Sequence, residues 1–212
     1  MKDKRSAEKT YYPIFVELSG KKCVVVGGGT VAERKVRTLL EHGARVVVVS
    51  PRLSRGLSNL KKRGLVEHLR RGFRKGDCRG SLLVFAATDS RKVNSAVAEE
   101  ASCASGLVNV VDTPEFCSFI VPSIVKRGAL SVAISTSGKS PALSKAIRKL
   151  LEGELSQEMG ALVSTLGEMR QRLREKIPEA QAKRKKKLTR AAERVLARSR
   201  ARKAQGGRKK CR

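Results

Sequence analysis

The feature that most constrains this chain is a glycine-rich turn between a short apolar run and a helical pattern. Residues 23–26 are apolar, three glycines occupy positions 27–29, and a second apolar, β-branched run spans residues 46–49. Between the two runs, apolar residues recur at helical spacing from Ala32 onward, and charged residues take the other face. This order predicts a βαβ unit whose strands lie in a parallel sheet covered on both faces.

The same alternation continues along the chain. Further strands are expected near residues 65–69, 82–86 and 107–110, with helices over residues 53–63 and 91–103. Five strands that alternate with helices predict an α/β fold, namely a Rossmann-like, doubly wound parallel sheet that ends near residue 112.

Beyond this domain the sequence predicts three smaller parts. Residues 113–152 begin irregularly and then read as a strand and a helix, so we expect them to form a second unit. Residues 153–202 are helical in pattern and basic, with a break at Pro178. Residues 203–212 are expected to form a disordered basic tail.

The positive charge is concentrated at the C-terminal end. The formal net charge is +28, and residues 170–212 carry 19 Lys or Arg against three acidic residues, a net of +16. A solvated helix, adhesion to RNA, DNA or a membrane, and capture of an anionic ligand all fit such a segment. No aromatic residue lies within it, so the stacking platform of a single-strand binder is missing.

Cysteine spacing and hydropathy point to a reduced, cytoplasmic protein. The five cysteines are scattered, with no CxxC pair and no His cluster at the spacing of zinc ligands, so we expect no metal site. No apolar run approaches the 18 or more residues of a membrane span, and no apolar signal segment follows the charged N-terminus.

The glycine turn has the pattern of a phosphate-binding loop. It reads Gly27, Gly28, Gly29, Thr30, Val31 and Ala32, which fits GxGxxG/A between a strand and a helix. Gly27 allows the tight turn, Gly29 lets a pyrophosphate approach the backbone, and Ala32 permits close packing of helix and sheet. The N–H groups and the dipole at the helix start favour phosphates. A purely structural glycine turn is the alternative.

The end of the second strand lacks the usual acidic residue that binds the ribose. The chain reads Ser50, Pro51 and Arg52 there, which leaves NAD and NADP both open. Arg52 or Arg55 could contact a 2′-phosphate, or either could be solvated at the start of a helix.

Two further segments end at the same edge of the predicted sheet. Ala87 and Thr88 follow the fourth strand, where ligands of such folds bind, although a helix N-cap by Thr88, Asp89 or Ser90 explains them equally well. Asp112 follows the last strand, where a carboxylate could remove a proton as hydride leaves a substrate. A capping or turn role for Asp112 is the alternative.

Three stretches of sequence carry a resemblance to a known family. They are YYPIFVELSGKKCVVVGGGTVAERKVRTLLEHGARVVVVSP, FAATD, and NVVDTPEFCSFIVPSIVKRGALSVAISTSGKSPALSKAIR. Over about residues 11–152 the chain resembles the precorrin-2 dehydrogenase and sirohydrochlorin ferrochelatase family, which forms the N-terminal module of siroheme synthases.

The resemblance implies the roles of the parts and of single residues. It implies an NAD-binding domain over residues 1–112, a dimerisation region over residues 113–152 and a C-terminal helical domain, and it favours NAD over NADP. It also implies that Asp112, in the NVVD motif, is the catalytic carboxylate. The cofactor-binding residues that we expect are Gly27, Gly28, Gly29, Thr30, Val31, Ser50, Pro51, Arg52, Ala87 and Thr88.

The reaction that the resemblance implies is the NAD-dependent oxidation of precorrin-2 to sirohydrochlorin. One alternative is a bifunctional enzyme that also inserts ferrous iron into sirohydrochlorin, and a more remote one is a catalytically inactive nucleotide-sensing or nucleic-acid-associated protein. The expected partners are the anionic tetrapyrrole and a second copy of the chain. We expect no membrane partner, and contact with nucleic acid only as nonspecific adhesion of the basic tail.

Overall fold

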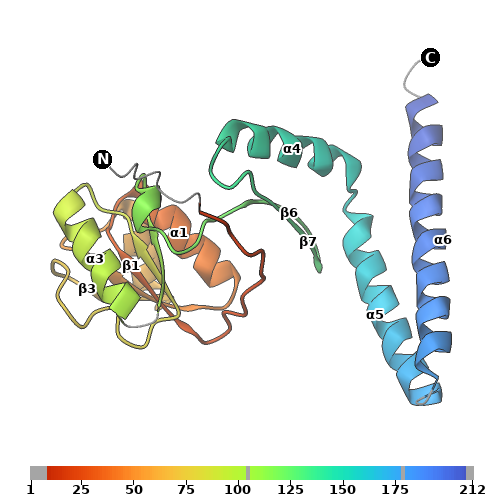
Figure 1. The fold of residues 1–212 in the computed structure, drawn as a ribbon, viewed down its shortest axis with the longest axis horizontal. Coiled ribbons are helices and arrows are strands. Elements are labelled where there is room, and N and C mark those ends of the chain that lie inside the picture. Colours follow the sequence, from red (N-terminus) through yellow and green to blue (C-terminus); the bar gives the residue numbers. More distant parts are fainter. Residues whose placement is uncertain (1–8, 104–105, 178–179, 209–212) are drawn as a thin grey trace, which may run out of the picture. The chain divides into compact units, whose positions relative to one another are not determined.

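The chain folds into two compact units, Met1–Val121 and Pro122–Arg212, in the computed structural model (Figure 1). The structure describes residues 9–103, 106–177 and 180–208. The first unit contains a parallel sheet with helices, and the second contains a small hairpin and helices.

The sheet of the first unit has five parallel strands in the order β3-β2-β1-β4-β5. The strands are β1 (Lys22–Val26), β2 (Arg45–Val49), β3 (Val66–Leu69), β4 (Leu83–Ala86) and β5 (Leu107–Val110). The strand order reverses between β1 and β4, which is where ligands of open α/β sheets bind. The expected Rossmann-like, doubly wound sheet is confirmed.

Helices cover both faces of this sheet. Its helices are α1 (Thr30–Glu41), α2 (Arg55–Lys62) and α3 (Arg91–Cys103). Val36 of α1 and Leu57 of α2 share one buried cluster with Val25, whereas Val97 of α3 joins Val24 in the other. Each of these side chains is fully buried, which stabilises the fold by about 1.5–3 kcal/mol per residue.

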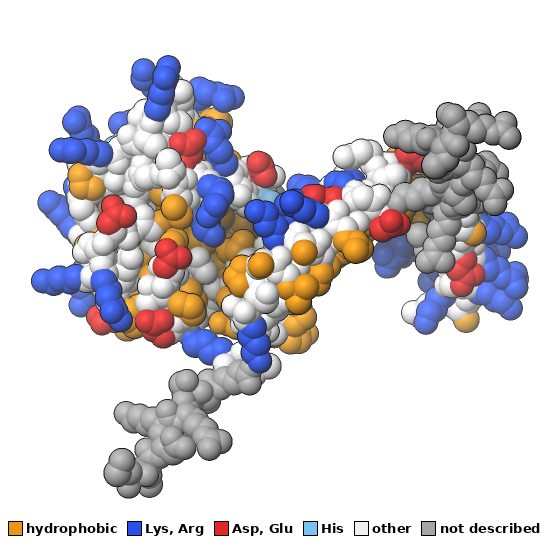
Figure 2. Space-filling model, turned by 90° about the horizontal axis from the view of Figure 1, so that it is seen from above, with side chains coloured by type: hydrophobic (Ala, Val, Ile, Leu, Met, Phe, Trp, Pro, Cys, Tyr) orange, Lys and Arg blue, Asp and Glu red, His pale blue; other side chains and the backbone are white. Residues whose placement is uncertain are grey.

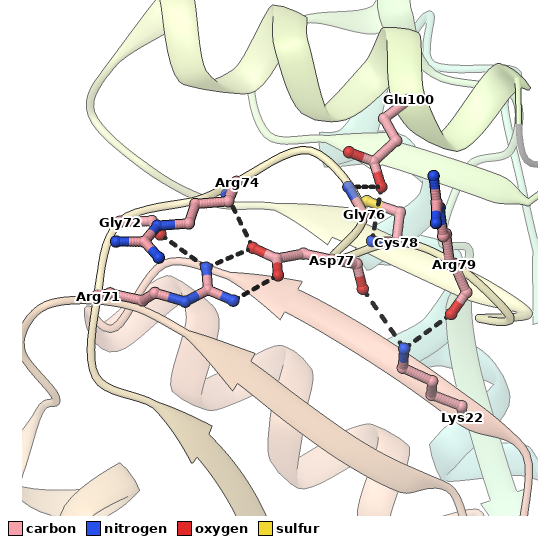
Figure 3. Close-up of polar contacts among 9 residues, drawn as sticks. All are labelled: Lys22, Arg71, Gly72, Arg74, Gly76, Asp77, Cys78, Arg79 and Glu100. Atoms are coloured by element: carbon pink, nitrogen blue, oxygen red, sulfur yellow. Dashed lines mark hydrogen bonds and ion pairs between the residues drawn. The ribbon is translucent and has the colours of Figure 1, made fainter.

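A network of polar contacts fixes the connection between β3 and β4 (Figure 3). The guanidinium of Arg71 donates two hydrogen bonds to Asp77, at 2.7 and 2.8 Å. Glu100 of α3 accepts two backbone N–H groups of the same loop, and Lys22 at the start of β1 donates to two of its carbonyls. The network thus spans the loop from the carboxyl end of β3, where Arg71 lies, to Lys22 at the amino end of β1.

The first unit extends beyond residue 112, where we expected it to end. A short 3-10 helix, η1 (Pro114–Phe116), follows β5, and the Ser118 hydroxyl then accepts the backbone N–H of Val108 at 2.8 Å. Phe119 packs edge-on against Phe85 of β4, with ring centroids 5.5 Å apart. These contacts attach residues 113–121 to the sheet.

The second unit begins with an antiparallel hairpin that the sequence pattern did not predict. Strands β6 (Ser123–Arg127) and β7 (Leu130–Ile134) pair along their whole length, and Gly128 turns between them with a φ of 56°. We expected only the second strand, because Pro122 directly precedes the segment of β6 and the sequence before it is irregular. Pairing with β7 decides its conformation.

Three helices complete the second unit: α4 (Pro141–Glu154), α5 (Glu158–Lys176) and α6 (Gln181–Arg208). The expected break lies between α5 and α6, although Pro178 itself is outside the described residues. Because α6 continues to Arg208, residues 203–208 are helical rather than disordered as expected, and residues 209–212 lie outside the described part. Among the described helices, none is both long and apolar enough to cross a membrane.

Candidate functional site

Four loops meet at the carboxyl edge of the parallel sheet. The glycine turn follows β1, residues 50–54 follow β2, residues 87–90 follow β4, and Asp112 follows β5. The strands are parallel and in register, so their carboxyl ends lie side by side. The fold therefore confirms the prediction that these segments lie at one edge of the sheet.

Close contact between loops requires the first two glycines of the turn. Gly27 has a φ of 128°, its N–H donates to the carbonyl of Val49 at 3.0 Å, and a Cβ there would lie 2.2 Å from the carbonyl oxygen of Ala87. A Cβ on Gly28 would lie 1.9 Å from the carbonyl oxygen of Arg52. These two positions therefore exclude any side chain, and the turn joins the loops after β2 and β4.

The third glycine faces open space at the start of α1. Gly29 is exposed, and a Cβ built on it would meet no atom within 4 Å. Gly29 is the N-cap residue and has no side chain, so the backbone N–H groups of Thr30 and Val31 at the start of α1 receive no capping hydrogen bond from it. Exposed N–H groups, the helix dipole and an open approach to the backbone fit the pyrophosphate of a dinucleotide.

The loop after β2 has a buried serine and an exposed basic residue. The hydroxyl of Ser50 donates to the carbonyl of Arg52 at 2.6 Å, and Nε2 of His68 lies 2.9 Å from the carbonyl oxygen of Ser50. Pro51 and Arg52 are exposed at the rim of the edge. The structure therefore brings Ser50 and Arg52 beside Gly28, as the expected site requires.

Glu33 of α1 connects the glycine helix to α2, a role that the sequence pattern did not reveal. Its carboxylate accepts hydrogen bonds from the hydroxyl of Ser54 at 2.6 Å and from Arg37 at 2.6 Å. These two hydrogen bonds, with Ser54 the larger cause, hold the pKa of Glu33 below its usual range. Ser54 also accepts the N–H of Leu57 and so caps α2.

A buried asparagine holds the loop after β4. Oδ1 of Asn94 accepts the Thr88 hydroxyl at 2.7 Å, and its Nδ2 donates to the Thr88 carbonyl at 2.9 Å. Ser90 is the residue that caps α3, since its hydroxyl accepts the N–H of Val93. Ala87 donates to the carbonyl of Val26, which places both Ala87 and Thr88 beside the glycine turn.

Asp112 lies at the same edge with a free carboxylate. It directly follows Val111, whose N–H donates to the carbonyl of Ala86 at 3.0 Å. Its backbone has a φ of 57°, a left-handed conformation that Asp tolerates better than most residues. The side chain is exposed, and it forms no hydrogen bond or ion pair with any residue in the described ranges. Its oxygens are thus available to a ligand.

Two residues that sequence reasoning missed fix residues 110–117, which we call the Asp112 turn. The buried thiol of Cys117 accepts the N–H of Val110 and donates to its carbonyl, both at 3.2 Å. The ammonium of Lys9 donates to the carbonyls of Pro114, Glu115 and Cys117 at 2.9–3.0 Å. The sequence offered one signal for the contact of Cys117, namely that this cysteine lies five residues after Asp112. It offered none for the contact of Lys9.

Metal-ligating side chains do not gather at this edge. Over the residues that the structure describes, no group of three or more His, Cys, Asp or Glu is placed to hold a metal ion. The four cysteines in those residues are all free thiols. Burial raises the pKa of the Cys78 thiol to about 12, so this thiol stays neutral and unreactive.

Two family models match the chain. The first, described as "Putative NAD(P)-binding", covers residues 14–123, and the second, described as "Sirohaem biosynthesis protein central", covers residues 127–154. The first match spans the whole parallel sheet and its helices, and the second spans β7 and α4.

The curated relatives of the chain are siroheme synthases. Siroheme synthase 3 of Aeromonas hydrophila is 45% identical over 164 residues, which are 77% of this chain and 35% of that protein. The siroheme synthase of Thioalkalivibrio sulfidiphilus is 41% identical over 175 residues, or 82% of this chain and 36% of that protein. The chain therefore spans about a third of the length of these relatives.

A solved structure resembles nearly the whole chain. It is described as "SirC, precorrin-2 dehydrogenase", is 28% identical, and superposes with a TM-score of 0.72 over 85% of this chain and 88% of that one.

Proposed function

This chain belongs to the siroheme-synthase family of NAD(P)-binding proteins, and we propose that it oxidises precorrin-2 to sirohydrochlorin with NAD as the hydride acceptor. The observation that carries the proposal is the position of Asp112. Its unpaired carboxylate lies at the edge of the sheet where Gly29 leaves an open phosphate-binding helix start.

NAD would be held by the loops after β1, β2 and β4. Gly29, Thr30 and Val31 would bind the pyrophosphate through their backbone, and the rim formed by Ser50, Pro51 and Arg52 would lie at the adenosine. The remaining members of this proposed site are Gly27, Gly28, Ala87 and Thr88. When bound, NAD would supply the acceptor for hydride.

In the reaction the substrate loses one hydrogen as hydride and one as a proton. Asp112 would accept the proton, since its carboxylate has no competing partner among the described residues. The Asp112 turn would keep the carboxylate in place, because Cys117 and Lys9 restrain the backbone on both sides of η1. General-base catalysis of this kind contributes about 10²–10⁴-fold.

We propose that an exposed apolar surface of the second unit forms the interface of a homodimer. Leu143, Ile147 and Leu150 of α4 are 52%, 36% and 66% exposed, and they recur at helical spacing. Such a contiguous apolar stripe is characteristic of an interface between subunits. The dimerisation region proposed for residues 113–152 thus includes the exposed face of α4.

We place the protein in the cytoplasm, which is a reducing compartment. Each of the described cysteines, Cys23, Cys78, Cys103 and Cys117, is a free thiol, as is usual for cytoplasmic chains.

Replacing Asp112→Asn tests the proposal directly. The amide cannot accept a proton, so the rate constant kcat for anaerobic precorrin-2 oxidation should fall by about 10²–10⁴-fold. The Kd for NAD should stay within about twofold, since Asn keeps the size of the side chain and favours the left-handed backbone. Glu115→Gln, a change to an exposed carboxylate in the same segment, is the matched control and should retain activity. Unchanged kcat in Asp112→Asn would exclude Asp112 as the base.

Iron insertion into sirohydrochlorin stays a prediction of the sequence resemblance. Adding ferrous iron to the completed reaction and following the formation of siroheme tests it.

A further inference from the structure

The last helix carries a stripe of positive charge on one side. Lys183, Lys187, Arg190 and Arg194 follow one another at intervals of four, three and four residues, so they lie on one face of α6. All four are exposed, and we call this set the cationic stripe. At 1.5 Å per residue it runs for about 16 Å along the helix.

A neighbouring side of α6 packs on α5. Leu188, Ala191 and Ala192 are partly buried, and they lie on the face that contacts α5. This packing leaves the cationic stripe exposed beside the contact between the two helices. Figure 2 shows Lys and Arg side chains gathered at this helix pair.

No acidic residue in the described part of the chain neutralises the stripe. None of its four side chains hydrogen-bonds or forms an ion pair with a described residue. Residues 181–208 contain twelve Lys or Arg and only one acidic residue, Glu193. Four exposed cations on one face, without a counterion among the described residues, are a binding surface for an extended polyanion.

We propose that the cationic stripe binds the sugar-phosphate backbone of double-stranded DNA without regard to sequence. A DNA duplex carries one negative charge per about 1.7 Å of its axis, so phosphates are available along the whole stripe. An α-helix, about 10–12 Å across, fits the major groove of B-form DNA, which is about 12 Å wide. The narrow major groove of duplex RNA does not admit it.

Other polyanions fit this surface less well. A single strand is bound largely through stacking on aromatic residues, and residues 170–212 contain none. A membrane-surface helix needs an exposed apolar face, whereas Leu188, Ala191 and Ala192, among the described side chains of α6, are partly buried. The tetrapyrrole substrate is compact, so it would cover only part of the charged surface. Further cations beyond the stripe continue along both helices, namely Arg170, Arg172, Arg174, Lys176, Lys185 and Lys186.

The test uses the full-length protein and a 30-base-pair DNA duplex of arbitrary sequence. Fluorescence anisotropy measures the Kd between 50 and 200 mM salt. Four phosphate contacts predict a weakening of about 150-fold over this range, from a logarithmic slope of about 3.6. Changing Lys183, Lys187, Arg190 and Arg194 together to Gln, which preserves helix propensity, should lower this logarithmic slope by about 3.6, the share of the four contacts.

The matched control removes the same charge from the first unit. Lys62, Arg70, Arg74 and Lys75 are exposed, and replacing all four with Gln lowers the net charge equally. This control should bind DNA within about threefold of the wild type if the binding is local to the stripe. Circular dichroism and NAD binding confirm that both variants fold.

Three further probes separate the alternatives: duplex RNA of the same length, phosphatidylserine vesicles and uroporphyrin, a tetrapyrrole with eight carboxylates. Equal loss of DNA binding in both variants would overturn the proposal, because general charge would then account for it. Stripe-dependent binding of RNA, vesicles or uroporphyrin with equal or greater affinity than DNA would overturn the assignment to DNA. None of these measurements needs catalytic turnover, so they do not depend on the proposed dehydrogenase.

Discussion

The thiol of Cys117 lies 3.2 Å from both the backbone N and the carbonyl O of Val110, the last residue of β5. One side chain thereby closes the turn that begins at the end of the strand and carries Asp112. The contact is buried, and it holds Asp112 in a left-handed conformation that would otherwise be costly. The position of the proposed catalytic carboxylate thus depends on a cysteine that takes no part in the chemistry.

Replacing Cys117→Ala should destabilise the protein and slow the reaction. The buried N–H of Val110 would lose its partner, which lowers the free energy of unfolding by about 1–3 kcal/mol. Urea denaturation measures this change, and kcat should fall while the Kd for NAD is retained. Cys103→Ala, at an exposed cysteine, is the control and should leave both quantities unchanged. Wild-type stability in Cys117→Ala would show that the thiol does not hold the turn.

The glycine turn predicts opposite effects for two neighbouring substitutions. Gly29→Ala places a methyl group in open space, so stability should be unchanged while the Kd for NAD rises by about tenfold or more, equivalent to ~1.4 kcal/mol. Gly28→Ala drives the methyl group into the Arg52 carbonyl and should lower stability by about 1–3 kcal/mol. Calorimetry with NAD and thermal denaturation distinguish the two. Normal NAD affinity in Gly29→Ala would place the pyrophosphate elsewhere.

The ion pair between Arg71 and Asp77 should make stability depend on acidity. The hydrogen bond from Arg71 is the main cause that lowers the pKa of Asp77 in the folded protein. Because the pKa of Asp77 is lowered, the pair stabilises the fold above about pH 4, the ordinary pKa range of Asp. This contribution is lost as the pH falls through the pKa of Asp77 in the folded protein.

Arg71→Gln should therefore reduce the free energy of unfolding at pH 7 and weaken its decline as the pH falls below about 4. Urea denaturation across this range measures both effects. Arg70→Gln changes an exposed neighbouring arginine and should resemble the wild type. A parallel decline in wild type and Arg71→Gln would mean that other carboxylates control the acid response.

The exposed face of α4 predicts the oligomeric state. Leu150→Glu places a charge on the apolar stripe and should shift the protein from dimer to monomer in sedimentation velocity. Lys145→Glu, on the other side of the helix, should leave the dimer intact. A wild-type protein that is monomeric at micromolar concentration would contradict the proposed dimer.

The sheet and the glycine turn could be predicted from sequence because local patterns determine them. Apolar runs such as residues 23–26, separated by a glycine turn and a helix, have few other solutions. Strand β6 was missed because its conformation depends on pairing with β7, which sequence periodicity does not record. Residues 113–121 were assigned to the second unit for the same reason, because sequence periodicity does not record their contacts with β4 and β5.

The candidate site divides in the same way. The positions of Gly29 and Asp112 at one edge follow from strand direction alone. The contacts of Lys9 and Glu33 join residues far apart in the chain, whereas Asn94 holds Thr88, six residues before it; nothing in the immediate sequence marks any of these roles. Long-range hydrogen bonds become visible only once the fold brings the partners together.

The most direct test of the central claim is an anaerobic reaction of enzymatically generated precorrin-2 with the purified protein and NAD, in which the absorbances of NADH and sirohydrochlorin are followed together. The account predicts that the two products appear in equal amounts and only in the presence of the protein. A protein that binds NAD but yields neither product would contradict the assignment as a precorrin-2 dehydrogenase.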